Sequence, residues 1–254
     1  MFLRFLPFIF LIIFSVNSMS FAQDIEKGSF TIKATSEDIL GFEMASSYSP
    51  VLEPDDVISW SVHVPENYDP SNPPGIMVYV GFRKLVKEPP GWMSAMDDSN
   101  LIWISANSSN SSIERKKMLL AILSLPLLQM DYVINTNRIY VAGFQHGGEI
   151  ASAAARVYPN IIKGGMYINC DPRTWGKKLP PQIDVMKENR YIFVSGKQNI
   201  AKQVMRYAIR KYNKEGINNT KQMVINHMGI NENIRRSKLL EAIRYLDQVE
   251  NSDD

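Results

Sequence analysis

The sequence predicts an α/β fold, with a mostly parallel central sheet, helices on both faces and a few antiparallel strands in front. Three observations predict it. Two early segments alternate polar and apolar residues, as strands with one solvated face do. Short, continuous apolar runs follow, as expected of strands buried on both faces, and they alternate with segments of helical periodicity. Between them, Arg138 to Tyr158 (RIYVAGFQHGGEIASAAARVY) has the pattern of a strand, a glycine-hinged turn and a helix.

Residues 1–22 have the pattern of a cleaved signal peptide. Met1 to Arg4 give a short positive start, Phe5 to Val16 form an almost unbroken apolar run, and Ser20 to Ala22 have the small residues that a signal peptidase accepts. We expect cleavage before Gln23 and export to the periplasm or the extracellular space. The alternative is an uncleaved membrane anchor, but the apolar run is shorter than the ~20 residues of a spanning helix. No second segment reaches that length, so we expect no transmembrane span after cleavage.

Residues 23–254 are expected to form a single domain. A chain of this length can bury ~70% of its unfolded surface around one core. The one cysteine, Cys170, excludes an intrachain disulfide. The formal net charge of +2, with both signs mixed along the chain, argues against a nucleic-acid-binding surface. We expect neither a cofactor nor a metal ion.

The first half of the chain contains four expected strands. Ser29 to Thr35 is an expected edge strand. Val57 to Val64 alternates again, and we expect its apolar residues to face inward and His63, on the polar side, to face solvent. Two buried strands are expected at 76–80 and 101–105, separated by a candidate helical segment at 92–98. Two buried strands joined by a helix predict a parallel crossover connection.

Strands and helices alternate regularly in the second half. A long helix is expected from about Ile113 to Val133, because Ser111 and Glu114 match a capping box at its start. Pro126 lies inside this helix and predicts a kink or a break. Further strands are expected at 139–142, 165–169, 191–195 and 221–225, and further helices at 149–158, 200–215 and 233–250. Ligands of such sheets bind beyond the carboxyl ends of the strands, so the residues just after each strand are the candidates for a site.

The turn inside the 138–158 segment has the spacing of a nucleophile elbow. In a G-x-S-x-G elbow, a serine sits at the apex of a strained strand-to-helix turn. Gly143 and Gly147 occupy the two glycine positions here, and the apex residue is Gln145. An amide side chain has no ionisable proton and is not a nucleophile. The sequence therefore predicts the frame of a serine-hydrolase site without its reacting atom.

Several segments, in order along the chain, resemble a known family. They are VPENYDPSNPPGIMVYV, LIWISANSS, NRIYVAGFQHGGEIASAAARVYP, GGMYI and the end of the chain. These segments are similar to secreted bacterial α/β-hydrolases of the polyhydroxyalkanoate-depolymerase-like and feruloyl-type esterase group. The resemblance covers nearly all of residues 23–254 and implies the α/β-hydrolase fold.

The resemblance also implies a degenerate catalytic triad. Gln145 stands where the relatives have the serine. The aspartate of the relatives follows a later strand in a G-x-x-D pattern, and the matching position is Asn199. The histidine position after the last strand falls on Ile230. Because a serine needs a base, and the base needs a carboxylate that holds its tautomer, this chain is expected to be a pseudo-esterase retained for binding a ligand or partner.

A binding site can persist after the catalytic triad is lost, because it can depend on backbone amides. The resemblance places the backbone amide of His146, partnered by one near Gly81 and Phe82, in the oxyanion hole. With Asn107, Trp175 and His227, these amides are candidates for binding a small ester, a carboxylate or a saccharide. Alternatively, Gln145 fills the hole with its own amide and closes the site.

Two further alternatives stay open. In the first, Cys170 is a relocated nucleophile with His227 or His146 as its base; in its simpler interpretation Cys170 is a buried, small apolar residue. In the second, the protein is a structural or adhesive surface protein whose contact loops include Ser105 to Ser112 and the proline-rich stretch near Trp175.

Overall fold

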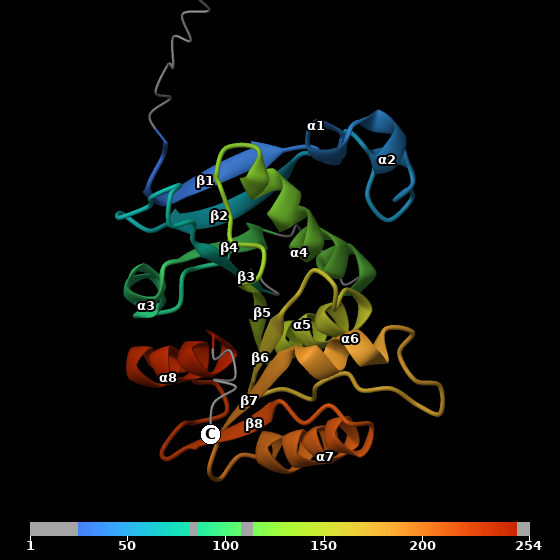
Figure 1. The fold of residues 1–254 in the computed structure, drawn as a ribbon, viewed down its shortest axis with the longest axis vertical. Helices are drawn as coiled ribbons and strands as arrows, with labels where there is room; N and C mark the ends of the chain where they lie inside the picture. Colours follow the sequence, from blue (N-terminus) through green and yellow to red (C-terminus); the bar gives the residue numbers. More distant parts are fainter. Residues whose placement is uncertain (1–24, 82–85, 108–113, 248–254) are drawn as a thin grey trace, which may run out of the picture.

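Eight strands form one sheet in the order β1-β2-β4-β3-β5-β6-β7-β8 (Figure 1). The structure is a computed structural model that describes residues 25–81, 86–107 and 114–247. β1 pairs with β2, and β2 with β4, in antiparallel directions, whereas all the other pairs are parallel. This confirms the predicted mostly parallel sheet with antiparallel strands in front. The strands are β1 (Gly28–Ala34), β2 (Ile58–Val64), β3 (Gly75–Val80), β4 (Leu101–Asn107), β5 (Ile139–Phe144), β6 (Gly164–Ile168), β7 (Arg190–Gly196) and β8 (Thr220–Ile225).

Helices cover both faces of the sheet, as predicted. In Figure 1, α3 and α8 lie on one side of the sheet and α4 to α7 on the other. Each face has its own apolar cluster: Trp92 of α3 and Ile243 of α8 belong to one, and Leu120 of α4, Ala151 of α5 and Met205 of α7 to the other. The helices are α1 (Ser36–Leu40), α2 (Phe42–Ser46), α3 (Trp92–Ser99), α4 (Glu114–Gln129), α5 (His146–Val157), α6 (Ile183–Glu188), α7 (Ala201–Lys214) and α8 (Arg236–Asp247).

Helix α4 continues through Pro126, so of the expected kink or break at this residue, the break was wrong. A proline removes one backbone donor and crowds the preceding turn, which destabilises a helix in isolation. Here Leu123, Leu127 and Leu128 are buried on both sides of the proline, and their packing holds both halves of the helix in place. The expected capping serine, Ser111, and the expected signal peptide lie outside the described residues.

The prediction that His63 faces solvent was also wrong. The residue is only 7% exposed, because α3 covers the side of β2 on which it lies. Its Nε2 atom lies 2.9 Å from Oδ1 of Asp97 on α3, and its Nδ1 atom lies 2.9 Å from Oγ of Ser29 on β1. Alternation along β2 correctly separated its two faces but could not show that a helix covers the polar one.

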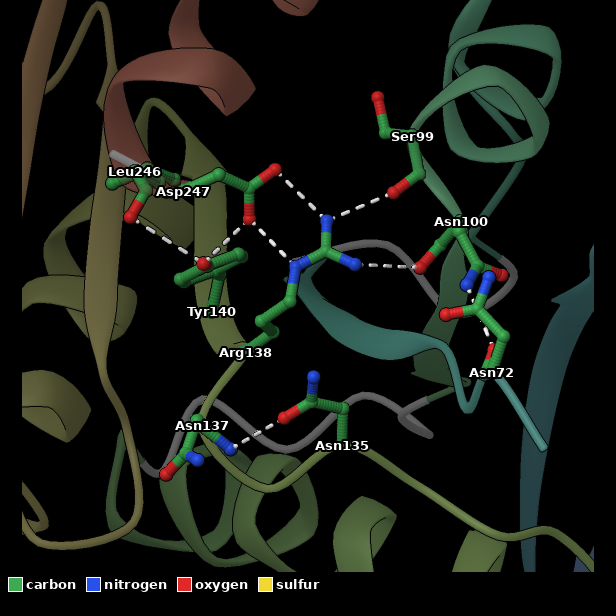
Figure 2. Close-up of polar contacts among 9 residues, drawn as sticks. All are labelled: Asn72, Ser99, Asn100, Asn135, Asn137, Arg138, Tyr140, Leu246 and Asp247. Carbon is green, nitrogen blue, oxygen red and sulfur yellow. Dashed lines mark hydrogen bonds and ion pairs between the residues drawn. The ribbon is translucent and has the colours of Figure 1, made fainter. Parts of the chain in front are cut away.

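A polar cluster around Arg138 closes the amino end of the sheet (Figure 2). Arg138 directly precedes β5, and its Nε and Nη2 atoms donate to the two carboxylate oxygens of Asp247 at 2.8 Å each. Nη2 also donates to the carbonyl of Ser99 at 2.8 Å, and the Tyr140 hydroxyl donates to Asp247 Oδ1 at 2.7 Å. Burial, followed by the charge of Asp247, raises the pKa of Tyr140, so its hydroxyl remains a donor. The cluster joins α3, β5 and α8 at the end of the sheet opposite the elbow.

Among the described residues, no helix combines the length and the apolar character needed to cross a membrane.

Candidate functional site

The turn between β5 and α5 has the backbone of a nucleophile elbow. Gln145, at the apex, has a φ of 52° and a ψ of −126°, a backbone conformation that residues other than glycine rarely adopt. The glycines around it are required by close approach. A Cβ atom at Gly147 would lie 2.0 Å from the carbonyl oxygen of Val80, and one at Gly143 would lie 2.3 Å from the carbonyl of Gly147. The sequence therefore holds a strained turn at the centre of the sheet, between β3 and β6 (Figure 1).

The side chain of Gln145 reaches the loop that follows β8. Its Nε2 atom donates to the carbonyl oxygen of Ile230 at 3.1 Å and to Oδ1 of Asn231 at 3.0 Å. Two of the three positions that the family resemblance assigned to the triad are thus in direct contact. The contact is a hydrogen bond from an amide to a backbone carbonyl, and it uses the backbone rather than the side chain of Ile230.

Asn169, which follows β6, connects the third position. The residue is 5% exposed, and its Oδ1 atom accepts a hydrogen bond from Asn199 Nδ2 at 2.9 Å and one from the Gly196 amide at 3.3 Å. Its Nδ2 atom donates to three carbonyl oxygens of the loop after β8, those of Gly229 at 3.0 Å, Ile230 at 3.4 Å and Glu232 at 3.1 Å. We call Gln145, Asn169, Asn199 and the loop 229–232 the amide clasp.

The amide clasp brings Gln145, Asn199 and Ile230 to one place at the carboxyl ends of β5, β7 and β8. Asn199 also has a second local role, because its Oδ1 atom accepts the backbone N–H of Ala201 at the start of α7. Sequence reasoning missed Asn169 as a site residue. Its signals were a polar residue directly after a buried strand and a residue type that tolerates the left-handed conformation, and its φ is 46°.

A pocket of about 190 Å³ lies beside the elbow. Its walls come from the first turn of α5, from residues 169–171, from the first turns of α7 and from Ile230. A second, wider pocket of about 590 Å³ lies between residues 197–200 and 226–230, and the two pockets share Ile200 and Ile230. His227 lines the wider pocket, is exposed and has a φ of 60°. The structure therefore places His227 beside the amide clasp, in a different pocket from His146.

His146 belongs to a chain of charged contacts at the mouth of the elbow pocket. Its Nδ1 atom lies 3.3 Å from Glu149 Oε2, which also pairs with Arg173 Nη2 at 3.0 Å. The same guanidinium nitrogen lies 2.6 Å from Glu114 Oε1. One ligand atom each from Glu114, His146 and Glu149 lies within 4.8 Å of the others, a spacing that suits a metal ion. Arg173 already places a positive charge against both carboxylates.

Cys170 lines the elbow pocket together with His146. The thiol is buried against the elbow helix, since a Cβ atom at Gly148 would lie 2.7 Å from its Sγ atom. Burial, and then the carboxylates of Glu149 and Asp171, raise the pKa of this thiol well above its usual value. Because the thiolate is the nucleophile, these surroundings disfavour Cys170 as a relocated nucleophile.

The other candidates lie apart from the pocket lining. Asn107 binds the hydroxyls of Ser59 and Ser61 through its Nδ2 atom, at 3.2 and 3.0 Å, and accepts the Val86 amide. Trp175 packs on the ring of Tyr212 and lines a separate groove of about 520 Å³ with residues 178–182.

The proposed oxyanion-hole residues flank the elbow. Gly81 follows β3, and a Cβ atom at Gly147 would lie 3.9 Å from its Cα atom. His146 is the first residue of α5, so its backbone N–H has no acceptor within the helix. Phe82 lies outside the described residues.

Solved structures of several hydrolases share this fold. A protein described as a dipeptidyl aminopeptidase IV from Bacteroides ovatus superposes with a TM-score of 0.62 and 15% identity, over 86% of this chain and 35% of the other. A thermostable esterase superposes with a TM-score of 0.59 and 14% identity, over 85% of this chain and 59% of the other. A ferulic acid esterase superposes with a TM-score of 0.60 and 10% identity, over 87% of this chain and 98% of the other. The chain thus spans about a third and three fifths of the length of the first two.

No protein-family model matches the sequence, and no curated protein matches it either. At these identities the likeness to solved structures establishes the fold alone. The strand order, the antiparallel front strands, the elbow at the end of β5 and the superpositions agree. The chain therefore has the α/β-hydrolase fold of esterases and dipeptidyl peptidases.

Proposed function

We propose that this chain is an exported protein that has lost serine-hydrolase catalysis at its elbow and binds a small ester, carboxylate or saccharide there. One observation carries the proposal. The apex residue of the elbow is Gln145, and its side-chain amide is bound to the Ile230 carbonyl and to Asn231. The position from which a nucleophile would attack is therefore held by a hydrogen-bonded structural contact. The export component rests on the signal-peptide pattern of residues 1–22.

The other two triad positions, Asn199 and Ile230, do not supply the missing chemistry. A base that removes a proton from a serine must have a titratable nitrogen or carboxylate within hydrogen-bond reach. Ile230 has none, and Asn199 uses its amide to bind Asn169 and to cap α7. Removal of the nucleophile or base from a serine triad costs about 10⁶ in turnover, and the remainder comes from the oxyanion hole and from binding.

Binding remains chemically reasonable at the elbow pocket. The first amides of α5 carry the positive end of the helix dipole, which favours a carboxylate or a carbonyl oxygen. Ile200, Val204 and Ile230 give the same pocket an apolar wall. A small carboxylate or ester has both a polar group for the amides and an apolar body for that wall. The volume of about 190 Å³ suits a single small group.

The alternative, an ester hydrolase that uses Cys170, has less support. The raised pKa of the buried thiol keeps it protonated, and a protonated thiol is a poor nucleophile. His146 is held by Glu149 rather than by Cys170.

Restoring the triad tests the assignment of the three positions. A Gln145→Ser, Asn199→Asp, Ile230→His variant is expected to hydrolyse p-nitrophenyl acetate measurably faster than the wild type. The matched control, Gln145→Ser with Asn199→Asp, retains Ile230 and is expected to stay at the wild-type rate, because it lacks the histidine at the third triad position. Equal rates in a folded triple variant and its control would contradict the assignment.

Ligand binding is tested separately by titration with benzoate, methyl benzoate and xylobiose, monitored by backbone amide NMR. At least one of the three is expected to shift the resonances of His146 and Gly147. No shift at the elbow at millimolar concentrations of any of them would contradict a binding role for the pocket.

A further inference from the structure

A serine, a histidine and an aspartate form a continuous hydrogen-bonded series far from the elbow. Ser29 Oγ lies 2.9 Å from His63 Nδ1, and His63 Nε2 lies 2.9 Å from Asp97 Oδ1. We propose that Ser29 is an activated nucleophile that accepts an acyl or phosphonyl group from an activated donor, with His63 as its base and Asp97 as the positioning residue. This site goes beyond the function proposed for the elbow.

The fold holds the three side chains in place. Ser29 on β1 and His63 on β2 are directly paired in the antiparallel register, so their side chains lie on the same face of the sheet. Asp97 comes from the last turns of α3, which covers that face. The three residues thus come from three different elements, and regular secondary structure fixes each of them.

The aspartate sets the tautomer that the chemistry requires. A carboxylate only accepts hydrogen bonds, so Asp97 requires the proton of a neutral imidazole to be on Nε2. The lone pair of Nδ1 then faces the hydroxyl of Ser29, which donates to it. This is the arrangement of a nucleophile, a base and an orienting carboxylate, with the two ring nitrogens exchanged relative to the serine-protease case.

The burial of the three residues suits a reaction at the surface. The His63 side chain is 8% exposed, which shields the imidazole from competing water, and that of Asp97 is 37% exposed. Ser29 itself is exposed and lies on the outermost strand of the sheet. A donor can therefore reach the hydroxyl from solvent. Three strands, β2, β4 and β3, separate β1 from the elbow strand β5 (Figure 1).

The reaction follows from these contacts. Ser29 Oγ attacks the acyl carbon or the phosphorus of the donor while His63 Nδ1 takes up the hydroxyl proton. The bond from Oγ to that atom forms, and the bond to the leaving group breaks. The leaving group, such as p-nitrophenolate or fluoride, departs with the electron pair of the broken bond and receives the proton from the imidazolium. The product is Ser29 esterified on Oγ, with His63 neutral again.

The test is covalent labelling of the full chain with a fluorophosphonate probe, followed by peptide mass spectrometry. We expect one adduct, on Ser29, and none in Ser29→Ala. Thr31→Ala is the matched control, because Thr31 is an exposed hydroxyl two residues along the same strand, paired with Ser61 instead of a histidine. It should be labelled at the wild-type rate. An unlabelled wild-type protein, or an adduct elsewhere only, would overturn the proposal.

Asp97→Asn separates activation from a purely structural role of the histidine. An asparagine amide can donate to Nε2 and thereby favour the tautomer that places a proton on Nδ1, facing Ser29. We expect the labelling rate to fall by at least about 100-fold while the circular dichroism spectrum is unchanged. A folded Asp97→Asn variant labelled as fast as the wild type would refute the relay.

Discussion

At the scale of single residues, Asn169 has the largest role in the carboxyl edge of the sheet. Its side-chain amide uses both its donor and its acceptor groups, and five hydrogen bonds join β7, the start of α7 and the loop after β8. The residue is almost fully buried, and of the three carbonyls that it binds, that of Gly229 also accepts the Glu232 amide and that of Ile230 also accepts Gln145 Nε2. Asn169 therefore keeps Asn199 and Ile230 near Gln145.

Asn169→Ala is expected to destabilise the protein by about 3 kcal/mol, because the five hydrogen bonds of its buried side-chain amide are lost at once. The free energy of unfolding in urea measures the effect. Asn231→Ala is the control: Asn231 gives up only its hydrogen bond with Gln145, which is exposed, and should lose less than about 1 kcal/mol. Equal losses in the two variants would contradict the role of Asn169.

Cys170 is expected to be unreactive in the folded protein. Its raised pKa leaves little thiolate at about pH 8, so iodoacetamide should alkylate it at least about 100-fold more slowly than in the urea-unfolded chain. Mass spectrometry of the alkylated peptide follows the reaction. Rapid alkylation of the native protein would instead favour Cys170 as a relocated nucleophile.

At the scale of elements, the elbow depends on close backbone contacts that leave no room for a side chain. The start of α5 lies directly against the end of β3, and the missing side chain of Gly147 makes that approach possible. The strained apex conformation of Gln145 persists because β5 and α5 fix the chain on both sides of it. The elbow is thus part of the scaffold whatever residue stands at its apex.

Gly147→Ala is expected to lower the free energy of unfolding by more than about 3 kcal/mol, because its Cβ atom would lie 2.0 Å from the Val80 carbonyl oxygen. The matched control is Gly176→Ala, where a Cβ atom meets nothing within 4 Å. That variant should stay within about 0.5 kcal/mol of the wild type in the same urea titration. Similar stabilities of the two variants would show that the elbow can relax.

The sequence predicted the elements well where periodicity was strong. All eight strands were predicted to within one or two residues at nearly every end, and so was the parallel crossover from β3 to β4. It missed α1, α2 and α6, which have five or six residues each and are too short to show a helical period. The Thr35 and Asp38 capping pair was the only local signal for α1.

The site was predicted less completely, because its side chains are directed by distant parts of the chain. The positions of Gln145, Asn199 and Ile230 came from local motifs and the family resemblance. The side chain of Asn107 is oriented by its hydrogen bonds to Ser59 and Ser61 of another strand, and no local sequence pattern predicts such contacts. His63 likewise depends on Asp97 of α3, which follows β3 in the chain.

At the scale of the whole molecule, the two ends of the sheet are closed in different ways. The amino end has an arginine–aspartate pair, whose side chains are 23% and 28% exposed, with a tyrosine and two backbone carbonyls around it (Figure 2). The carboxyl end has the neutral amide clasp and two pockets. The charged cluster fixes α8 and α3 to the sheet, and the amide clasp leaves an accessible pocket at the elbow.

Arg138→Met is expected to destabilise the protein by about 3 kcal/mol, because it leaves the half-buried Asp247 carboxylate without its charged partner. Arg236→Met is the control. Arg236 pairs with Asp98 at the surface, where the side chains are 46% and 47% exposed, and its loss should cost less than about 1 kcal/mol. Thermal and urea unfolding of both variants measure the difference, and a larger loss for Arg236→Met would contradict this account.

The loss of catalysis at the elbow is tested most directly by steady-state hydrolysis of p-nitrophenyl acetate. The measurement uses the Ser29→Ala variant, so that only the elbow site can contribute. We predict turnover no faster than that of the same variant carrying Gln145→Ala and His146→Ala as well. Turnover at an enzyme-like rate of about 1 s⁻¹ or more in Ser29→Ala, abolished by the two elbow substitutions, would contradict the central claim.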